Sequence, residues 1–249
     1  MSNSKKKHLT LVEELIRRGL AKDQPHATGL ILSGQVVVND QRVDKIGSHV
    51  TELCQIRLKN QERFVSRGGD KLLSAIEALS LTENFKDKTV LDIGSSTGGF
   101  TDCVLQLGAT KVIAVDVGTN QLAWKLRNNP RVMSFEKTDI RDYIHDSSIQ
   151  IDWVVADISF NSLTRVTKSI VSIAPSAKLL LLIKPQFELP AELVPEGGVV
   201  LDEADRELAV ASVSSEISNI GYQILGTIDS AIKGRTGNQE IFIYCAPTT

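Results

Sequence analysis

The segment from Val90 to Asp102 constrains the fold of this chain more than any other. It reads Val-Leu-Asp-Ile-Gly-Ser-Ser-Thr-Gly-Gly-Phe-Thr-Asp, an apolar run that ends in a glycine-rich turn and continues into a helical pattern. Glycines let a backbone pass close to a bound molecule, and the start of a helix offers unpaired N–H groups. The spacing matches neither G-x-G-x-x-G nor G-x-x-x-x-G-K-[ST], the usual dinucleotide and phosphate-loop motifs. The segment therefore predicts a strand, a ligand-binding turn and a helix, for a ligand of another kind.

A carboxylate at the end of the next predicted strand indicates that ligand. Residues 111–118 read Lys-Val-Ile-Ala-Val-Asp-Val-Gly. This places Asp116 where an acid accepts hydrogen bonds from both ribose hydroxyls of an adenosine. No Lys or Arg lies within residues 90–110 to neutralise a phosphate, which favours S-adenosylmethionine, whose charged end is an amino acid and a sulfonium. The alternative is that Asp92 and Asp116 only begin turns, but the glycines beside them favour a binding site.

Strand and helix patterns alternate through the rest of this region. Expected strands are residues 89–93, 112–115, 132–135, 153–156, 179–183, 222–228 and 241–244. One helix is expected to begin at residue 69 or 70. Four more are expected over residues 98–107, 121–127, 163–173 and 203–217. The tetrapeptide of residues 66–69 is expected to form a turn before the first of them. Such alternation predicts an α/β fold with a doubly wound, mostly parallel sheet, whose ligands bind at the carboxyl ends of the strands.

Polar residues stand at those strand ends. Asp139, Asp157 and Lys184 each follow an expected strand, and Glu240 precedes the last one. Neighbouring strand ends would bring Asp157 and Lys184 together, either as reactive groups or as a structural salt bridge.

Residues 1–64 follow a different pattern. Helical spacing of apolar residues spans 9–20 and a second helix is expected over 25–33, followed by a hairpin over 36–43 and a strand near 55–59. This part carries 11 Lys and Arg residues against 7 Asp and Glu, whereas the remainder carries 17 against 23. A basic head on an acidic body indicates contact with a polyanion, and the alternative is a solvated surface.

Composition excludes several classes of protein. The longest aliphatic run, residues 179–183, is far shorter than the roughly 20 apolar residues that a membrane helix requires, and no signal peptide is evident. Three widely separated cysteines predict free thiols in a reducing, cytoplasmic compartment. The four histidines show no ligand spacing, so no metal is expected.

Residues 17–21 (Arg-Arg-Gly-Leu-Ala) and 30–39 (Leu-Ile-Leu-Ser-Gly-Gln-Val-Val-Val-Asn) resemble the S4-type RNA-binding domain. The resemblance implies a small α+β domain that docks on structured RNA through backbone and shape. Two arginines that usually contact phosphate in that domain are absent here, at the positions of residues 10–12 and 23–24. A capping module without a nucleic-acid role is the alternative. The cations expected to contact RNA are Lys5, Lys6, Lys7, Arg17, Arg18, Lys22, Arg42 and Arg67.

Five motifs in order resemble the TlyA, or hemolysin-A-type, family. They are Ser66-Arg67-Gly68-Gly69-x-Lys71-Leu72, the motif of residues 92–102, Asp157-x-Ser159-Phe160, Lys184-Pro185-Gln186-Phe187-Glu188 and Gly237-Asn238-x-Glu240. The resemblance implies an S4-type domain over 1–64 and an FtsJ-like, Rossmann-like methyltransferase domain over 65–249. It also implies S-adenosylmethionine as cofactor and structured RNA as partner, either ribosomal RNA or ribosomal subunits, with a cytidine of ribosomal RNA as the favoured target.

The resemblance also implies the site residues. A tetrad for ribose 2′-O-methylation falls on Lys71, Asp157, Lys184 and Glu240. Cofactor contacts fall on Gly94, Ser96, Gly98, Phe100, Asp116, Asp139 and Asp157. The chain departs from the family at Asp139, where relatives often have Asn, and at residues 230–232, which read Ser-Ala-Ile where Ser-Pro-Ile is usual.

The chemistry can also be reasoned from the residues. A ribose hydroxyl is a poor nucleophile, so a group beside its oxygen must favour proton loss. Lys184 is the best candidate, through its charge or by accepting the proton. Two other functions remain open: a non-catalytic RNA-binding or ribosome-binding factor that keeps the fold, and the membrane-lytic activity that the family's historical name suggests.

Overall fold

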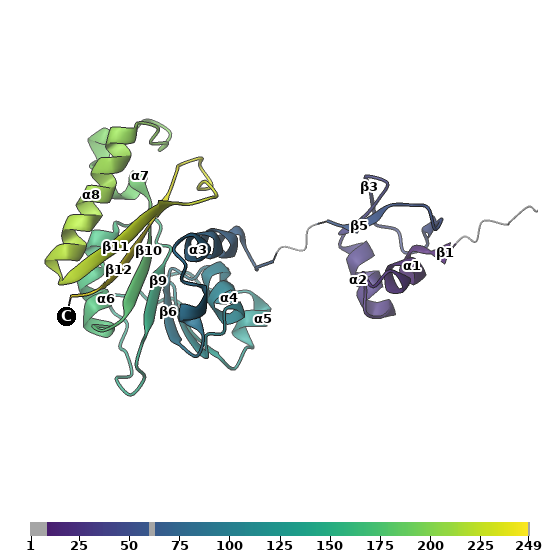
Figure 1. Cartoon of the computed structure of the whole chain (residues 1–249), viewed down its shortest axis with the longest axis horizontal. Coiled ribbons are helices and arrows are strands. Elements are labelled where there is room, and N and C mark those ends of the chain that lie inside the picture. The colour runs from purple at the N-terminus through teal and green to yellow at the C-terminus, as the bar shows by residue number, and fades with distance from the viewer. Residues whose placement is uncertain (1–8, 60–62, 249) are drawn as a thin grey trace, which may run out of the picture. The chain divides into compact units, whose positions relative to one another are not determined.

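A computed structural model of the chain describes residues 9–59 and 63–248 (Figure 1). The chain divides into two compact units with the boundary between Arg63 and Phe64. Each unit has its own hydrophobic core. The assignment of the smaller unit to the S4 type stays a prediction.

The smaller unit is an α+β fold. Its elements are β1 (Leu9–Thr10), α1 (Leu11–Arg17), α2 (Gln24–Leu32), β2 (Val36–Val38), β3 (Gln41–Val43), β4 (His49–Val50) and β5 (Ile56–Leu58). The strands form a sheet of order β3-β2-β5 and a separate β1-β4 pair. Asn39 and Asp40, both with positive φ, form the tight turn between β2 and β3, as the sequence predicts.

Helix α1 is shorter than its apolar spacing suggests. Its N-cap is Thr10, whose hydroxyl accepts from Glu13 N at 3.2 Å while the Glu13 carboxylate accepts from Thr10 N at 3.0 Å. This capping box fixes the start of the helix two residues after the predicted start at residue 9. Gly19, at φ +69°, lies in the turn that follows the helix.

The larger unit is built on a seven-stranded sheet of order β11-β12-β10-β9-β6-β7-β8. The strands are β6 (Thr89–Ile93), β7 (Lys111–Val115), β8 (Val132–Phe135), β9 (Trp153–Ala156), β10 (Lys178–Ile183), β11 (Tyr222–Asp229) and β12 (Ile241–Pro247). Strands β6 to β10 are mutually parallel, and β12 pairs antiparallel with both β10 and β11. The chain runs from β6 outward to β8 and then crosses back to β9. The crevice where α/β sheets bind ligands therefore lies between β6 and β9, at the carboxyl ends of these strands.

Helices cover both faces of this sheet (Figure 1). They are α3 (Arg67–Ala78), α4 (Gly99–Gln106), α5 (Trp124–Arg127), α6 (Thr167–Ile173), α7 (Pro185–Glu188) and α8 (Glu203–Asn219), with short 3₁₀ turns η1 (Thr82–Phe85), η2 (Leu163–Arg165) and η3 (Ala191–Leu193). Alternate residues of one strand enter the two cores. In β9, Trp153 packs with α3 and α4, whereas Val154 packs with α6 and α8. The doubly wound, Rossmann-like fold class predicted from the sequence is confirmed.

In the larger unit, three predicted helical segments differ from the structure. Helix α3 begins at Arg67 with Ser66 as its N-cap, so residues 66–69 are not a separate turn. The helix expected over 121–127 is only the four residues of α5, because Ala123 has extended backbone. The helix expected over 163–173 is divided into η2 and α6 at Val166. No helix of the described residues is long and apolar enough to cross a membrane.

Candidate active site

Three of the predicted tetrad residues lie at one edge of the central sheet. Asp157 directly follows β9, Lys184 directly follows β10, and Glu240 directly precedes β12. Ile183 pairs with Ile241 in the antiparallel register, so Lys184 and Glu240 are the next residues along these two neighbouring strands. The register of the sheet thus brings these polar groups to the carboxyl edge, where ligands of such folds bind.

The amine of Lys184 has two contacts in the loop after β9. Its Nζ lies 2.6 Å from Asp157 Oδ1 and donates a hydrogen bond to Ser159 Oγ at 2.7 Å. Asp157 Oδ1 receives no hydrogen bond, so its contact with the amine is an ion pair by distance alone. The Lys184 side chain is 10% exposed and that of Asp157 is 26% exposed. A protonated amine has three N–H donors, and this geometry leaves capacity on the amine for a further acceptor.

The second pair of the tetrad joins helix α3 to the loop before β12. Lys71 Nζ donates to Glu240 Oε2 at 2.5 Å, and the two side chains are 10% and 4% exposed. Lys71 lies in the second turn of α3, because the helix begins earlier than predicted. Taking two charges out of water is costly unless they are paired, so each partner holds the other in place. The structure therefore brings the four predicted residues to one edge of the sheet as two Lys–carboxylate pairs, of which Lys71–Glu240 is buried and Lys184–Asp157 is partly exposed at its carboxylate.

Two glycines of the glycine-rich turn combine a positive φ with close neighbours. The backbone of Gly94, at φ +75°, lies so close to the end of the neighbouring strand β9 that a Cβ there would be 2.6 Å from Asp157 O. Gly98, at φ +97°, is the N-cap of α4, and a Cβ there would lie 2.3 Å from Leu126 Cδ1. These close approaches explain why the turn is built from glycine.

Asp116 links the turn after β6 to the turn after β7. Its Oδ2 accepts from Ser96 N at 2.7 Å and its Oδ1 accepts from Gly118 N at 2.6 Å. Each carboxylate oxygen can accept a second hydrogen bond, so ribose hydroxyls can still be bound. The predicted cofactor residues Gly94, Ser96 and Asp116 thus belong to one connected pair of turns.

Two other predicted cofactor residues lie in surroundings that the sequence does not indicate. The Asp139 carboxylate is paired with Arg141 Nη2 at 2.6 Å, and this hydrogen bond lowers the pKa of Asp139. Phe100 is 3% exposed and its ring stacks on Phe242 in the core, with 6.0 Å between ring centroids. Contact between Phe100 and a cofactor would therefore have to use its backbone, because the side chain fills the core beneath the turn.

Asp92 and Ser159 lie beside the predicted site residues, although both were named only within motifs and neither is in the tetrad or the cofactor set. Asp92 is fully buried, Thr101 Oγ1 donates to its Oδ2 at 2.5 Å, and its Oδ1 has no hydrogen-bond partner. Burial raises the pKa of Asp92 to about 7. The signal for Asp92 was an acid inside an otherwise apolar strand, and the signal for Ser159 was its place two residues after Asp157. Within residues 9–59 and 63–248, no three His, Cys, Asp or Glu side chains form a group that could hold a metal ion.

The predicted RNA-binding residues of the smaller unit differ in their surroundings. Arg17 and Arg18 both pair with the buried carboxylate of Glu14 at 2.6 Å. Arg18 also donates to Cys54 O at 2.8 Å and to Glu52 O at 3.0 Å. Its guanidinium therefore has a structural role within the smaller unit.

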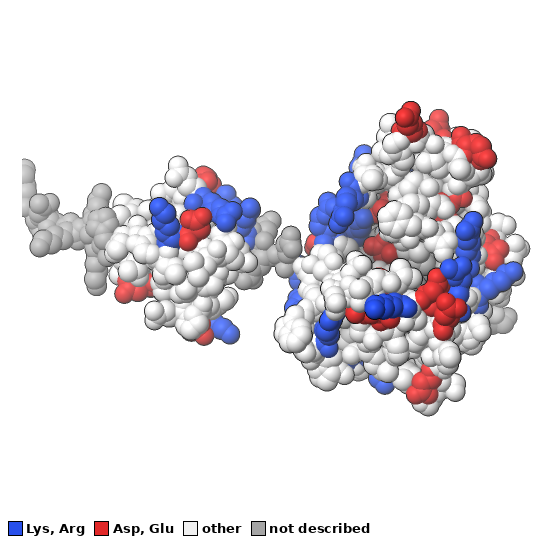
Figure 2. All heavy atoms as spheres, turned by 180° about the vertical axis from the view of Figure 1, so that it is seen from behind, with Lys and Arg blue, Asp and Glu red and all other residues white. Residues whose placement is uncertain are grey.

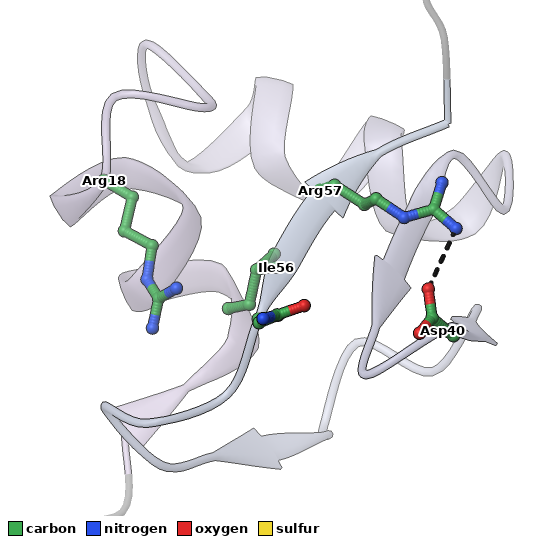
Figure 3. A pocket seen from close by; sticks show the side chains of 5 residues that line it. Arg18, Asp40, Ile56 and Arg57 are labelled. Carbon is green, nitrogen blue, oxygen red and sulfur yellow. Dashed lines mark hydrogen bonds and ion pairs between the residues drawn. The ribbon is translucent and has the colours of Figure 1, made fainter.

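Lys22, Arg42 and Arg67 are exposed, whereas Lys5, Lys6 and Lys7 lie outside the described residues. A cavity of about 340 Å³ in the smaller unit is lined by Arg18, Asp40, Gln55, Ile56 and Arg57 (Figure 3). Arg57 turns toward Asp40 and pairs with it at 3.2 Å, which neutralises part of the positive charge around this cavity.

Comparison with known proteins places this chain in a family. The family described as FtsJ-like methyltransferase matches residues 64–247. The chain is 38% identical over 240 residues to the 16S/23S rRNA (cytidine-2′-O)-methyltransferase TlyA of Mycobacterium tuberculosis, covering 95% of this chain and 89% of that one. It is 35% identical over 241 residues to Hemolysin A of Brachyspira hyodysenteriae, covering 95% and 99%.

Solved structures agree with this placement. A hemolysin candidate from Streptococcus thermophilus superposes with a TM-score of 0.72 at 33% identity, covering 98% of this chain and 90% of that one. An S-adenosylmethionine-dependent methyltransferase from Aquifex aeolicus shares the fold, with a TM-score of 0.52 at 16% identity over 74% of this chain and 95% of that one. With a family match across the whole larger unit and relatives that align over nearly its full length, the chain belongs to the FtsJ-like methyltransferases and, within them, to the TlyA and hemolysin A group.

Proposed function

We propose that this protein transfers the methyl group of S-adenosylmethionine to the 2′-hydroxyl of a cytidine ribose in ribosomal RNA. The observation that carries the proposal is the presence of two Lys–carboxylate pairs at one sheet edge, next to the glycine-rich turn. The relatives support the substrate, since the TlyA proteins of Mycobacterium tuberculosis and Campylobacter jejuni are named as rRNA (cytidine-2′-O)-methyltransferases.

The residues of the site fit this cofactor. The backbone at Gly94 packs directly against Asp157 O at the end of β9, which brings the turn after β6 next to Asp157, and Asp92 Oδ1 is a buried acceptor without a donor. A cationic or N–H-bearing group would satisfy such an acceptor. We assign the holding of the cofactor to the backbone at Gly94, Ser96, Gly98 and Phe100 and to the carboxylates of Asp116, Asp139 and Asp157. When bound, the cofactor supplies a methyl group on a positively charged sulfur.

Lys184 is assigned to the reacting hydroxyl. The Lys184 amine is held by Asp157 and Ser159 and has capacity for one more partner, so it can favour proton loss at the ribose oxygen through its charge or by accepting the proton. Lys71 from α3 and Glu240, directly before the neighbouring strand β12, form the second pair of the tetrad. The main contribution of the chain is to align the ribose oxygen with the methyl group. The loss of translational and rotational entropy then occurs on binding and not in the chemical step.

The partner and the compartment follow from the substrate. We assign ribosomal RNA, alone or within a ribosomal subunit, as the partner and the cytoplasm as the location. The free cysteines Cys54, Cys103 and Cys245 support a reducing compartment.

The test is methyl transfer to RNA that lacks the modification. Purified protein, labelled S-adenosylmethionine and ribosomal subunits from a strain without this protein would be incubated, and ribose methylation mapped at nucleotide resolution. We expect label on the 2′-oxygen of one cytidine, and none with Lys184→Ala. Binding of RNA without any transfer would instead establish a non-catalytic factor. Leakage of liposomes by monodisperse protein would establish the membrane-lytic alternative.

A further inference from the structure

The loop between β11 and β12 carries two cations beside the active-site carboxylate. Lys233 and Arg235 flank Gly234, and a Cβ at Gly234 would lie 2.5 Å from Glu240 Oε1. Both cations are exposed, and no ion pair among the described residues includes either of them. The two cations are therefore exposed to solvent and are the immediate neighbours of Gly234, whose backbone contacts the Glu240 carboxylate.

This loop is held in one conformation by buried hydrogen bonds. Asn238 is fully buried, its Oδ1 accepts from Val200 N at 2.7 Å, and its Nδ2 donates to Gly198 O at 2.8 Å. Asn238 O accepts from Gly234 N at 2.9 Å. The segment with the two cations is thus tied to Asn238 by its own backbone, and Asn238 is tied to the loop before α8. A pre-formed loop loses little entropy when its charges meet a ligand.

A third exposed cation lies near Lys71, the residue that pairs with Glu240. Arg67 is the first residue of α3 and lies four residues before Lys71, so the two residues are neighbours along one side of that helix. None of the ion pairs within residues 9–59 and 63–248 includes Arg67. Figure 2 shows Lys and Arg side chains gathered on the flank of the larger unit where Figure 1 places the β11–β12 loop. This concentration stands out because the larger part of the chain is acidic overall.

The chemistry of RNA specifies what such cations would meet. Every internal ribose carries a phosphodiester on the 3′-oxygen, next to its 2′-hydroxyl, so a target hydroxyl at the Lys–carboxylate pairs brings backbone phosphates to the surrounding rim. Lys and Arg are the side chains that bind phosphate oxygens. We propose that Lys233 and Arg235, together with Arg67, form a phosphate-binding rim that seats the RNA backbone at the active site. The proposal rests on the proposed function and adds a second RNA contact, separate from the smaller unit.

The test compares a charge-neutral loop with a matched control in the full chain. The variant is Lys233→Gln with Arg235→Gln, and the ligand is protein-free ribosomal RNA. We expect the slope of log K against log salt to shrink by about 1.4 to 1.8, for two lost phosphate contacts, and KM for RNA to rise roughly tenfold. The rate at saturating RNA and the affinity for S-adenosylmethionine should stay the same. The control, Lys86→Gln with Lys111→Gln, removes the same charge at the opposite edge of the sheet and should leave the salt slope and KM unchanged.

Three results would overturn the proposal. The first is an unchanged salt slope and KM in the neutral variant. The second is an equal loss in the charge-retaining exchange Lys233→Arg with Arg235→Lys, because the loop shape rather than its charge would then matter. The third is a loss on whole subunits but not on protein-free RNA, which would identify a ribosomal protein as the partner. If the wild-type chain transferred no methyl group to any RNA, the proposed function would fail, while the salt slopes would still decide whether the rim binds phosphate.

Discussion

Each unit contains a cluster of cationic side chains around a carboxylate, and the two clusters differ in how many of their hydrogen-bonding groups the protein itself occupies. In the smaller unit, the buried Glu14 carboxylate accepts from Arg17 Nε at 2.7 Å, from Arg17 Nη2 at 2.6 Å and from Arg18 Nε at 2.6 Å. These hydrogen bonds lower the pKa of Glu14 to about 2, with that from Arg17 as the largest cause. Arg18 completes its coordination with backbone carbonyls. The polar capacity of this cluster is filled by the protein itself, so it ties α1 to the loop before β5.

The cluster around Lys184 is left incomplete. Its amine has two partners, Ser159 Oγ and Asp157 Oδ1, although a protonated amine has three N–H donors, and Asp157 stays 26% exposed. Unfilled capacity at a sheet edge is available to a ligand, whereas filled capacity is not. The comparison teaches that burial and charge alone do not identify a reactive cluster. The four predictions below test it, beginning with the largest effect.

Removing the amine of Lys184 should cost the most. Lys184→Ala is expected to lower the rate of methyl transfer by about 10² to 10⁴, the usual value of a positioned proton-transfer group, and to leave cofactor affinity nearly unchanged. Lys184→Arg should not restore the rate, because a guanidinium stays protonated and is wide and planar. Single-turnover transfer and melting temperature should be measured on both variants. An active Arg variant with a stable fold would show that Lys184 is a structural cation like Arg18.

Removing the Asp116 carboxylate should weaken cofactor binding. Asp116→Ala removes the acceptor for Ser96 N and Gly118 N as well as the predicted ribose contact. The expected loss is about 1.5–3 kcal/mol, the range for hydrogen bonds to charged groups. Calorimetry with S-adenosylmethionine measures it, and Asp116→Asn, which keeps one acceptor oxygen, should lose less. Unchanged affinity in the Ala variant would mean that the cofactor lies elsewhere.

The Glu14 cluster should contribute to the free energy of unfolding, and this contribution should depend on pH. The folded pKa of Glu14 is about 2 against an ordinary 4.5, so its contribution is fully present above about pH 4.5 and is lost as pH falls toward 2. The half-exposed Arg17 is screened by water, which reduces the contribution to about 1–2 kcal/mol. Glu14→Gln should therefore unfold at lower temperature near neutral pH and lose less stability on acidification than wild type. Amide exchange of α1 reports both effects, with the exposed Asp44→Asn as control. A variant with the wild-type acid profile would contradict this account.

Exposed cations of the smaller unit should give the smallest change in stability. Lys22→Gln with Arg42→Gln is expected to reduce the salt slope of RNA binding by about 1.4 to 1.8 and to change the free energy of unfolding by no more than about 0.5 kcal/mol. Arg18→Gln should do the reverse, because its guanidinium bonds Glu14 and two carbonyls. Filter binding over a salt series and thermal melts on both proteins distinguish the roles. Equal salt slopes in wild type and the Lys22–Arg42 variant would remove these two residues from the RNA surface.

Much of the fold was predictable because its signals are local. The apolar runs that became β6, β7, β9 and β10 end at the predicted residues, and the turn at Gly94 and Gly98 requires the positive φ that only glycine adopts without strain. Helix ends were less predictable. Helices α1 and α3 begin at Leu11 and Arg67 and not at the predicted residues, because a helix start depends on backbone geometry that hydrophobic spacing does not report. Of the two N-cap residues, Thr10 accepts a capping hydrogen bond through its side chain and Ser66 does not.

By itself, the sequence determined the alternation of strands and helices and the position of the glycine-rich turn, and short motifs that resemble a known family supplied Lys71, Asp157, Lys184 and Glu240 as candidates. Only the tertiary structure decided which of them pair. Lys71 and Glu240 are 169 residues apart, and sheet register with the packing of α3 brings them into contact. The same holds for Phe100, which turned into the core, and for Arg18, which became structural. Contacts between distant segments depend on how whole elements pack, and no local pattern of residues carries that information.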